Sequence, residues 1–234
     1  MRRRRLRRKL KNWLRTTFPP RFVTRQRGVQ SYAQLQQDLW VVSETGGKSD
    51  GYFVEVGACD GVALSNTYLL EQMGWRGLLA EPNPEMAERI TTRRKAPLCT
   101  RPVGRTSGEE VTMLFIPDAP ELSTMQQFET VDRHAAARAE HVKVIQETIG
   151  LNDLLARHQA PRTIDFISID TEGSEPDILA GFDFDAYDVR LFAIEHNYTP
   201  AQQQIDRLMQ ARGYQRVHRL WSQWDSWYRK RPTS

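Results

Sequence analysis

The stretch "YFVEVGACDGVALSNTYLL", residues 52–70, decides the fold. Its first five residues, 52–56, alternate in the manner of a buried strand. Gly57 and Gly61 break this pattern, and a helical pattern starts at Ser65. Open α/β sheets bind ligands at such a junction of strand, glycine turn and helix, because helix amides point into the crevice at the carboxyl end of the strand.

The acids in and near the glycine loop select the class of ligand. Glu55 before the loop and Asp60 within it would repel the pyrophosphate of a dinucleotide and favour a positively charged ligand. S-adenosylmethionine has a sulfonium, an ammonium and no phosphate. Glu81 lies twenty residues beyond Gly61, where an acid accepts hydrogen bonds from the hydroxyls of an adenosine ribose. We therefore expect S-adenosylmethionine; a plain tight turn is the alternative for the glycines alone.

The composition is that of one globular domain. The 234 residues are 39% hydrophobic and 26% charged, which are ordinary values. Because no run of about 18 apolar residues occurs and the N-terminus lacks the apolar core of a secretory signal, we expect a cytoplasmic protein. Cys59 and Cys99 have neither the number nor the spacing of a disulfide framework or a metal cluster, so we expect reduced thiols.

The net charge of +4 combines two regions of opposite sign. Residues 1–27 hold twelve of the 33 basic residues and no acid, which leaves 21 basic against 29 acidic residues in 28–234. We expect a basic arm over 1–27 and an enzyme domain over 28–234. A nucleic-acid enzyme usually carries its basic surface on the folded domain, so this distribution argues against a nucleic-acid partner.

The arm has the pattern of an amphipathic helix. One helical stripe contains Leu6, Leu10, Trp13, Leu14 and Phe18. Such a basic helix suits an anionic membrane surface, where each basic residue contributes about 1 kcal/mol. The hypothesis is peripheral attachment to the inner membrane face through residues 1–22; a solvated arm and an RNA-binding arm are the alternatives.

Strand and helix patterns alternate along the rest of the chain. Strands are expected at 52–56, 77–81, 98–103, 110–116, 163–170 and 189–195, and helices at 31–44, 65–73, 84–94 and around Ile205, Leu208 and Met209. Residues 119–141 are irregular, and 214–230 have the pattern of a hairpin. The alternation predicts an α/β fold with a parallel sheet, and the hairpin predicts one antiparallel strand at its end.

A second set of acids lies in "DFISIDTEGSEPDILAGFDF", residues 165–184. Its apolar strand delivers Asp170 and Glu172 to the carboxyl edge of the sheet, and the strand in "FAIEHN" delivers Glu195 and His196 to the same edge. His196 is a candidate base, because histidine takes a proton near neutral pH. The alternative is a structural histidine held by hydrogen bonds.

These residues carry a resemblance to a known family. The motifs "VEVGACDG", "LLAEPNP", "FISIDTEGSEPDIL" and "IEHNYTP" follow one another as in the FkbM family of S-adenosylmethionine-dependent O-methyltransferases, which the chain resembles over about residues 31–229. The resemblance implies the class I methyltransferase fold, an α/β, Rossmann-like, mostly parallel seven-stranded sheet with a reversed last strand and helices on both faces. Members of the family methylate hydroxyls of sugars, glycans and polyketides.

The resemblance also implies roles for single residues. The methionine part of the cofactor would be lined by Glu55, Gly57, Asp60 and Gly61, with Ala58 and Asn66 as further cofactor contacts. Glu81 would hold the ribose, Pro82 and Asn83 the adenine edge, and Asp170 the floor beneath the sulfonium. Many relatives have Asp in place of Glu55 and Asn in place of Cys59.

For the chemistry, the hypothesis is that His196 takes the proton of an acceptor hydroxyl while Asp170 and Glu172 orient the histidine or the sugar. In one alternative, Asp170 and Glu172 bind Mg²⁺ or Mn²⁺, which lowers the pKa of the hydroxyl. In another, these acids only cap backbone amides. We expect a sugar, glycan or lipid-linked saccharide as the acceptor, with a polyketide or other natural product as the alternative.

Overall fold

The structure, a computed structural model, describes residues 28–232, and its centre is the strand that the sequence places at the start of the domain. This strand, β1 (Tyr52–Val56), runs parallel to β2 (Arg76–Ala80) on one side and to β9 (Thr163–Ile169) on the other. The chain order reverses between β1 and β9. Such a switch point leaves a crevice at the carboxyl ends of the strands.

The central sheet has seven strands in the order β11-β12-β10-β9-β1-β2-β3. Its remaining strands are β3 (Leu98–Cys99), β10 (Asp188–Glu195), β11 (Tyr214–Val217) and β12 (Asp225–Lys230). Only β12, the last strand of the chain, runs against its neighbours in this sheet. The α/β class I fold, the mostly parallel seven-stranded sheet and the reversed last strand are confirmed.

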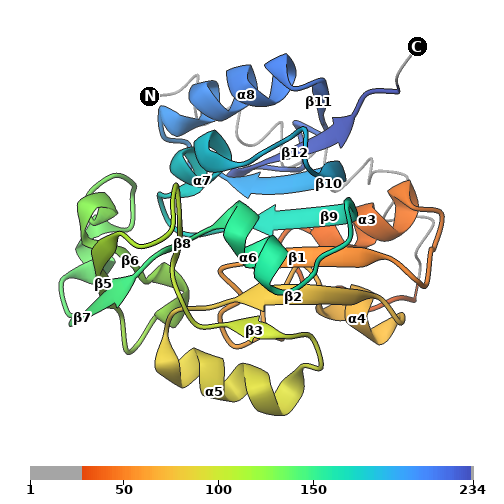
Figure 1. Ribbon diagram of the computed structural model, residues 1–234. Coiled ribbons are helices and arrows are strands. Elements are labelled where there is room, and N and C mark those ends of the chain that lie inside the picture. Colours follow the sequence, from red (N-terminus) through yellow and green to blue (C-terminus); the bar gives the residue numbers. More distant parts are fainter. Residues whose placement is uncertain (1–27, 233–234) are drawn as a thin grey trace.

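Helices cover both faces of the sheet, as expected (Figure 1). One face packs against α3 (Gln37–Glu44), α4 (Tyr68–Gln72) and α5 (Pro84–Arg93), and the other against α6 (Leu151–Arg157), α7 (Glu175–Gly181) and α8 (Ala201–Ala211). Alternate side chains of β1 enter the two cores, with Phe53 on the α3 side and Val54 on the α6 side. This is the period of two that a strand requires.

Three predicted elements differ from the structure by several residues at their boundaries. The helix expected at 31–44 begins only at Gln37, because Gln36 has a left-handed backbone with a φ of 64°. The helix expected at 65–73 begins only at Tyr68, because Ser65, Asn66 and Thr67 form a turn whose hydroxyls and amide donate to the Glu55 carboxylate. The strand expected at 98–103 divides into β3 and β4 (Val103–Gly104), and β4 leaves the central sheet to pair with β8 (Ile149–Gly150).

Beside the carboxyl ends of the strands lies a smaller antiparallel sheet (green in Figure 1). It contains β5 (Glu110–Phe115), β6 (Thr124–Met125) and β7 (Val142–Glu147). The irregular segment 119–141 carries three short 3₁₀ turns, η1 (Pro120–Leu122), η2 (Gln126–Phe128) and η3 (Ala135–Arg138). The segment therefore lies at the edge where the acids were expected.

The basic arm over residues 1–27 is outside the described residues, so the helix and membrane predictions for it stay predictions. Within 28–232, no helix has both the length and the apolar character that crossing a membrane requires.

Candidate active site

A cavity of about 310 Å³ opens at the carboxyl ends of β1, β2, β9 and β10. Its wall includes the predicted site residues Glu55, Gly57, Ala58, Asn66, Glu81, Pro82, Asp170 and Glu172, and it adds Glu195, Asn197 and part of the segment 119–141. Residues from four strands and the outer segment thus meet in one place. The crevice predicted from the strand and glycine-turn pattern is present.

Gly57 shapes the floor of this cavity. It has a φ of 83°, and an added Cβ would lie 1.7 Å from the carbonyl oxygen of Asp170, so no other residue fits without moving the end of β9. The amides of Gly57 and Ala58 both donate to the carbonyl of Ala80, at 2.9 and 3.2 Å. The glycine loop is therefore pressed against β2 and β9 at the switch point.

Glu81, directly after β2, is a buried carboxylate in the cavity wall. Its two oxygens accept the backbone amides of Cys59 at 2.8 Å and Asn83 at 2.9 Å. Burial raises the pKa of Glu81 to about 7 despite these hydrogen bonds. Each carboxylate oxygen has a second acceptor site, so Glu81 can also receive two hydroxyls from a ligand.

Glu55 lines the cavity, yet its carboxylate is hydrogen-bonded to other groups of the protein. It accepts the amide of Asn66 at 2.7 Å and the hydroxyls of Ser65 and Thr67 at 2.9 and 2.6 Å, and the buried Arg94 lies 3.5 Å away. Glu55 thus supports the turn over 65–67, and its predicted contact with the methionine part of a cofactor stays a prediction. Asn66, whose amide Glu55 accepts, also lines the cavity.

The Asn66 side chain is buried in the cavity wall with one free acceptor. Its Nδ2 donates to Ser168 Oγ at 2.8 Å, whereas its Oδ1 has no hydrogen-bond partner among the described residues. A buried carbonyl oxygen without a donor is rare in a folded protein. This atom is suited to an N–H donor on a ligand.

The structure does not bring three predicted cofactor residues, Asp60, Gly61 and Asn83, into the cavity wall. Asp60 turns its carboxylate to the amides of Val62 and Ala63, and Arg93 lies 2.6 Å from it. Gly61 packs against α5. Asn83 instead caps α5, since its Oδ1 accepts the amide of Glu85 at 3.0 Å. In the structure these three residues serve the loop and the helix, and their cofactor roles stay predictions.

Asp170, Glu172 and Glu195 form the acidic cluster of the cavity, with one oxygen of each within 4.8 Å of the others. Burial raises the pKa of all three acids, that of Asp170 to about 8. Repulsion by Asp170 adds to the effect for Glu172 and Glu195, and repulsion by Asp225 adds to it for Asp170, whose hydrogen bond with Glu195 acts in the opposite direction. Asn197 holds the cluster together by donating to Glu172 at 3.0 Å and Glu195 at 2.8 Å. Such a cluster exchanges protons near neutral pH.

His196 points away from the cavity, which corrects its prediction as the base. Its ring is buried; Nδ1 accepts the amide of Tyr198 at 3.0 Å, and Nε2 lies 3.0 Å from the carbonyl of Asp225. These partners fix a neutral ring with the proton on Nε2. Burial, together with the nearby Arg216, lowers the pKa of His196 to about 4. The imidazole therefore has no lone pair free for a substrate.

Sequence reasoning missed the residues that the segment 119–141 contributes. The cavity wall contains Arg133 and His134, and the fully buried Arg138 lies behind them. Arg138 donates to both oxygens of Asp132 and to Glu172, each at 2.9 Å. No hydrophobic period marks this stretch, and a buried arginine in "HAAARAE" has no local signal. One of its partners, Glu172, comes from another part of the chain.

The residues present fit S-adenosylmethionine. Glu81 has spare acceptor sites for ribose hydroxyls, and the Oδ1 of Asn66 is buried without a donor among the described residues. Gly57 keeps the floor of the cavity open. The acidic cluster also consists of hard oxygen ligands of the kind that Mg²⁺ and Mn²⁺ prefer.

Comparisons with known proteins give one family match and several distant structural likenesses. A search of the curated proteins found no match. Among solved structures, the methyltransferase domain of METTL16 is 13% identical, with 92% of this chain and 74% of that chain covered and a TM-score of 0.48. PH1948 from Pyrococcus horikoshii, described as a candidate RNA methyltransferase, is 10% identical, with 86% and 83% covered and a TM-score of 0.45.

A third structure, the ribosomal protein L11 methylase from Lactobacillus delbrueckii subsp. bulgaricus, is 10% identical, with 87% and 81% covered and a TM-score of 0.41. Because all three TM-scores are below 0.5, these likenesses say nothing about the acceptor. A family description carries more weight, since the Methyltransferase FkbM domain matches residues 55–216, which is more than half of the chain. The chain therefore belongs to the FkbM methyltransferase family, whose fold implies S-adenosylmethionine as the methyl donor.

Proposed function

We propose that this protein is an O-methyltransferase that methylates a hydroxyl of a sugar, glycan or lipid-linked saccharide. The observation that supports this proposal best is the acidic cluster of Asp170, Glu172 and Glu195 in the wall of the cofactor cavity. A hydroxyl is a poor nucleophile until its proton leaves, and the most effective base has a pKa near the working pH. Asp170 has such a pKa, because burial raises it to about 8.

In this proposal the cofactor supplies an electrophilic methyl group on a sulfonium. Glu81 would accept the two ribose hydroxyls, and Pro82 would contact the adenine edge. The Oδ1 of Asn66, which has no partner among the described residues, would accept an N–H of the ammonium group. Gly57 and Ala58 would line the methionine part, and Asp170 would contact the sulfonium end of the cofactor. These residues would hold the cofactor in one position, and such alignment of the reactants supplies much of the rate acceleration.

The acidic cluster acts on the other reactant. It takes the hydroxyl proton as the acceptor oxygen displaces sulfur at the methyl carbon. Asn197 keeps Glu172 and Glu195 in place through its two N–H groups. Since Arg138 is already paired with Glu172, Glu195 and Asp170 are the members that exchange the proton.

A metal-assisted version of the same reaction has one supporting observation. The Oδ1 of Asn197 is buried and has no hydrogen-bond partner within residues 28–232. It would be a fourth oxygen ligand for Mg²⁺ or Mn²⁺ after rotation of the amide. This version expects EDTA to abolish methyl transfer and Mg²⁺ or Mn²⁺ to restore it. Full activity in EDTA leaves the carboxylates as the base.

The acceptor class is tested with S-adenosylmethionine labelled in its methyl group. Monosaccharides, oligosaccharides, a polyketide alcohol and RNA are offered to the protein in parallel, with Glu195→Gln as the inactive control. The proposal expects label in a saccharide that survives mild alkali, because a methyl ether resists the treatment that removes a methyl ester. Label in the polyketide alone supports the alternative natural-product acceptor, and label in RNA alone contradicts both.

For the arm, we propose attachment of residues 1–22 to an anionic membrane surface, supported by its charge and apolar stripe alone. Deleting residues 1–22 is expected to abolish sedimentation with anionic liposomes and to leave cofactor affinity unchanged. The double change Trp13→Ser and Leu14→Ser keeps every basic residue. If it binds liposomes as strongly as the parent, the arm binds by charge only.

A further inference from the structure

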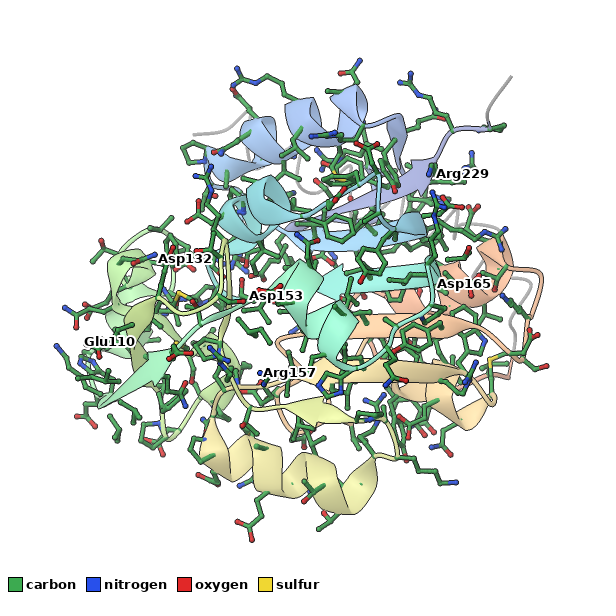
Figure 2. All side chains as sticks on the ribbon, in the orientation of Figure 1. Glu110, Asp132, Asp153, Arg157, Asp165 and Arg229 are labelled. Carbon is green, nitrogen blue, oxygen red and sulfur yellow. The ribbon has the colours of Figure 1, made fainter. Side chains whose placement is uncertain are left out.

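The segment 119–141 is anchored to the acidic cluster by a buried arginine. Arg138 is 0% exposed, and its guanidinium donates to the carbonyls of Leu122 and Glu129 at 2.8 and 3.2 Å as well as to Asp132 and Glu172. Figure 2 labels Asp132 in this segment. Removing one partner from such a buried network is costly, so the segment keeps one position over the cavity.

Asp132 uses this anchor to place the two residues that follow it. Its Oδ1 also accepts the amide of His134 at 2.7 Å, which fixes the turn through Arg133. As a result, Arg133 and His134 both enter the cavity wall. Arg138 therefore lies on the buried side of the segment, and the positively charged Arg133 lies on the side that lines the cavity.

Arg133 carries a positive charge that no acid neutralises. Among residues 28–232 it forms no ion pair; its Nε donates to His134 Nε2 at 3.1 Å, and Glu121, the acid of the segment that also lines the cavity, does not pair with it. Arg101, the other arginine of the wall, is already bound to the carboxylate of Glu147. Arg133 is thus the cation in the wall that a ligand can use.

Two aromatic rings set the direction of Arg133. Its guanidinium carbon lies 5.6 Å from the ring centre of Trp224 and 6.0 Å from that of Tyr198. Tyr198 is 58% exposed. Stacking holds a guanidinium in place while its N–H edges stay free for hydrogen bonds. An arginine in this arrangement binds a planar or tetrahedral oxyanion through two parallel N–H groups.

This platform adjoins the acidic cluster through the backbone. The carbonyl of Trp224 accepts the amides of His196 and Asn197 at 2.8 and 3.1 Å, and Asn197 holds Glu172 and Glu195. Tyr198 is the next residue along the chain. A ligand that meets Arg133 therefore has its other groups beside the base.

We propose that the acceptor carries an anionic group, a carboxylate or a phosphate, and that Arg133 binds this group while an acceptor hydroxyl faces the acidic cluster. The proposal rests on the proposed function, because it assigns the charge of that acceptor. The physical reason is electrostatic: Arg133 has no ion pair among residues 28–232, so an anionic group on the acceptor gains a charge-assisted hydrogen bond there that a neutral group does not.

The test uses protein saturated with S-adenosylhomocysteine and three probes of similar size: glucose, glucuronate and glucose 6-phosphate. Binding is measured by ligand-observed NMR at fixed ionic strength. We expect at least one anion to bind about tenfold more tightly than glucose, and Arg133→Gln to remove that preference. Glucuronate against glucose 6-phosphate shows which oxyanion the site takes.

Arg157→Gln is the matched control, because Arg157 is exposed on α6 (labelled in Figure 2) and lies outside the cavity wall. It should keep the full preference for the anion. Equal binding of all three probes, no binding of either anion, or an unchanged preference in Arg133→Gln would each overturn the proposal. If the anion preference depends on Arg133 but no saccharide in the labelling assay is methylated, the proposed acceptor class fails while the anion site stands.

Discussion

The acidic residues of the cavity belong to two regions, and their carboxyl groups have different surroundings in each. In the cofactor region, Glu55 and Glu81 follow the local chain and accept nearby backbone amides. In the acceptor region, Asp170 and Glu195 come from different strands and face each other, with one buried arginine for the whole group. The first arrangement gives carboxylates in fixed positions that accept hydrogen bonds. The second gives carboxyl groups whose pKa values are raised, so that they keep protons at neutral pH.

The largest effect is expected from Glu195→Gln in the acceptor region. The change keeps the shape and the hydrogen bond from Asn197 but removes one proton acceptor. Methyl transfer should fall about 10² to 10⁴-fold, while cofactor affinity measured by calorimetry stays nearly constant. If the rate falls less than tenfold, Glu195 is not a member of the base.

The same region predicts the pH dependence of the reaction. Because the Asp170 pKa is raised to about 8, a base in this cluster is protonated at pH 6 and ionised above pH 8. The maximal rate should therefore rise with pH through an apparent pKa near 8. In a Glu195→Ala background the residual rate should titrate at a higher pH, since Asp170 loses the hydrogen bond with Glu195 that lowers its pKa. An identical profile in parent and variant would place the base outside the cluster.

A smaller effect is expected from Glu81→Gln in the cofactor region. Affinity for S-adenosylmethionine should weaken by about 1 to 3 kcal/mol, or about 5- to 150-fold, because the ribose hydroxyls lose a charged acceptor. The Glu81 pKa is raised to about 7, so the affinity of the parent should also fall as the pH drops below 7. The variant has no carboxylate there and should lack this dependence. Equal affinities at pH 8 would remove Glu81 from the cofactor site.

The two regions also differ in how far the sequence predicts them. The glycine turn and the position of Glu81 after the second strand are local or periodic features, so the pattern of residues 52–81 was sufficient for them, whereas the seven-stranded sheet came from the family resemblance. The direction of His196 depends on the carbonyl of Trp224, just before β12, and on that of Asp225, the first residue of β12. A sequence pattern reports that a residue lies at a strand end but does not report which later segment covers it.

The same limit explains the other missed features. The burial of Arg138 depends on Asp132 and Glu172 together, and Glu172 belongs to another part of the chain. The late start of α4 depends on Glu55, which lies in β1 and collects the hydroxyls of the preceding turn. Both features are polar contacts across the fold, for which hydrophobic periodicity carries no signal.

His196→Asn is expected to act on stability and only weakly on the reaction. Both ring nitrogens already contact backbone groups, so replacing His196 should change the methylation rate less than about threefold. Replacing a catalytic base would lower the rate at least about a hundredfold. The folded-state pKa is lowered to about 4 from 6.5, so the unfolded chain binds a proton first as the pH falls. The parent should therefore lose about 3 kcal/mol of unfolding free energy relative to the variant between pH 6.5 and 4.

The smallest effect is expected from Asp60→Asn, which tests whether the acid inside the glycine loop touches the cofactor. The carboxylate of Asp60 lies outside the cavity wall and is used by the amides of Val62 and Ala63 and by Arg93. Asparagine keeps an oxygen that can accept both amides. Affinity for S-adenosylmethionine should then change less than about threefold, compared with the larger loss in Glu81→Gln.

Arg93→Gln is the matched control for this variant, because it removes the same ion pair and leaves the Asp60 carboxylate in place. If Asp60→Asn weakens the cofactor as strongly as Glu81→Gln while Arg93→Gln does not, the carboxylate turns toward the ligand on binding. The loop would then belong with the acids of the acceptor region, whose charge acts on a substrate. If both changes are silent, the acid in the loop stabilises the turn, and Glu81 alone carries the charge that the cofactor meets.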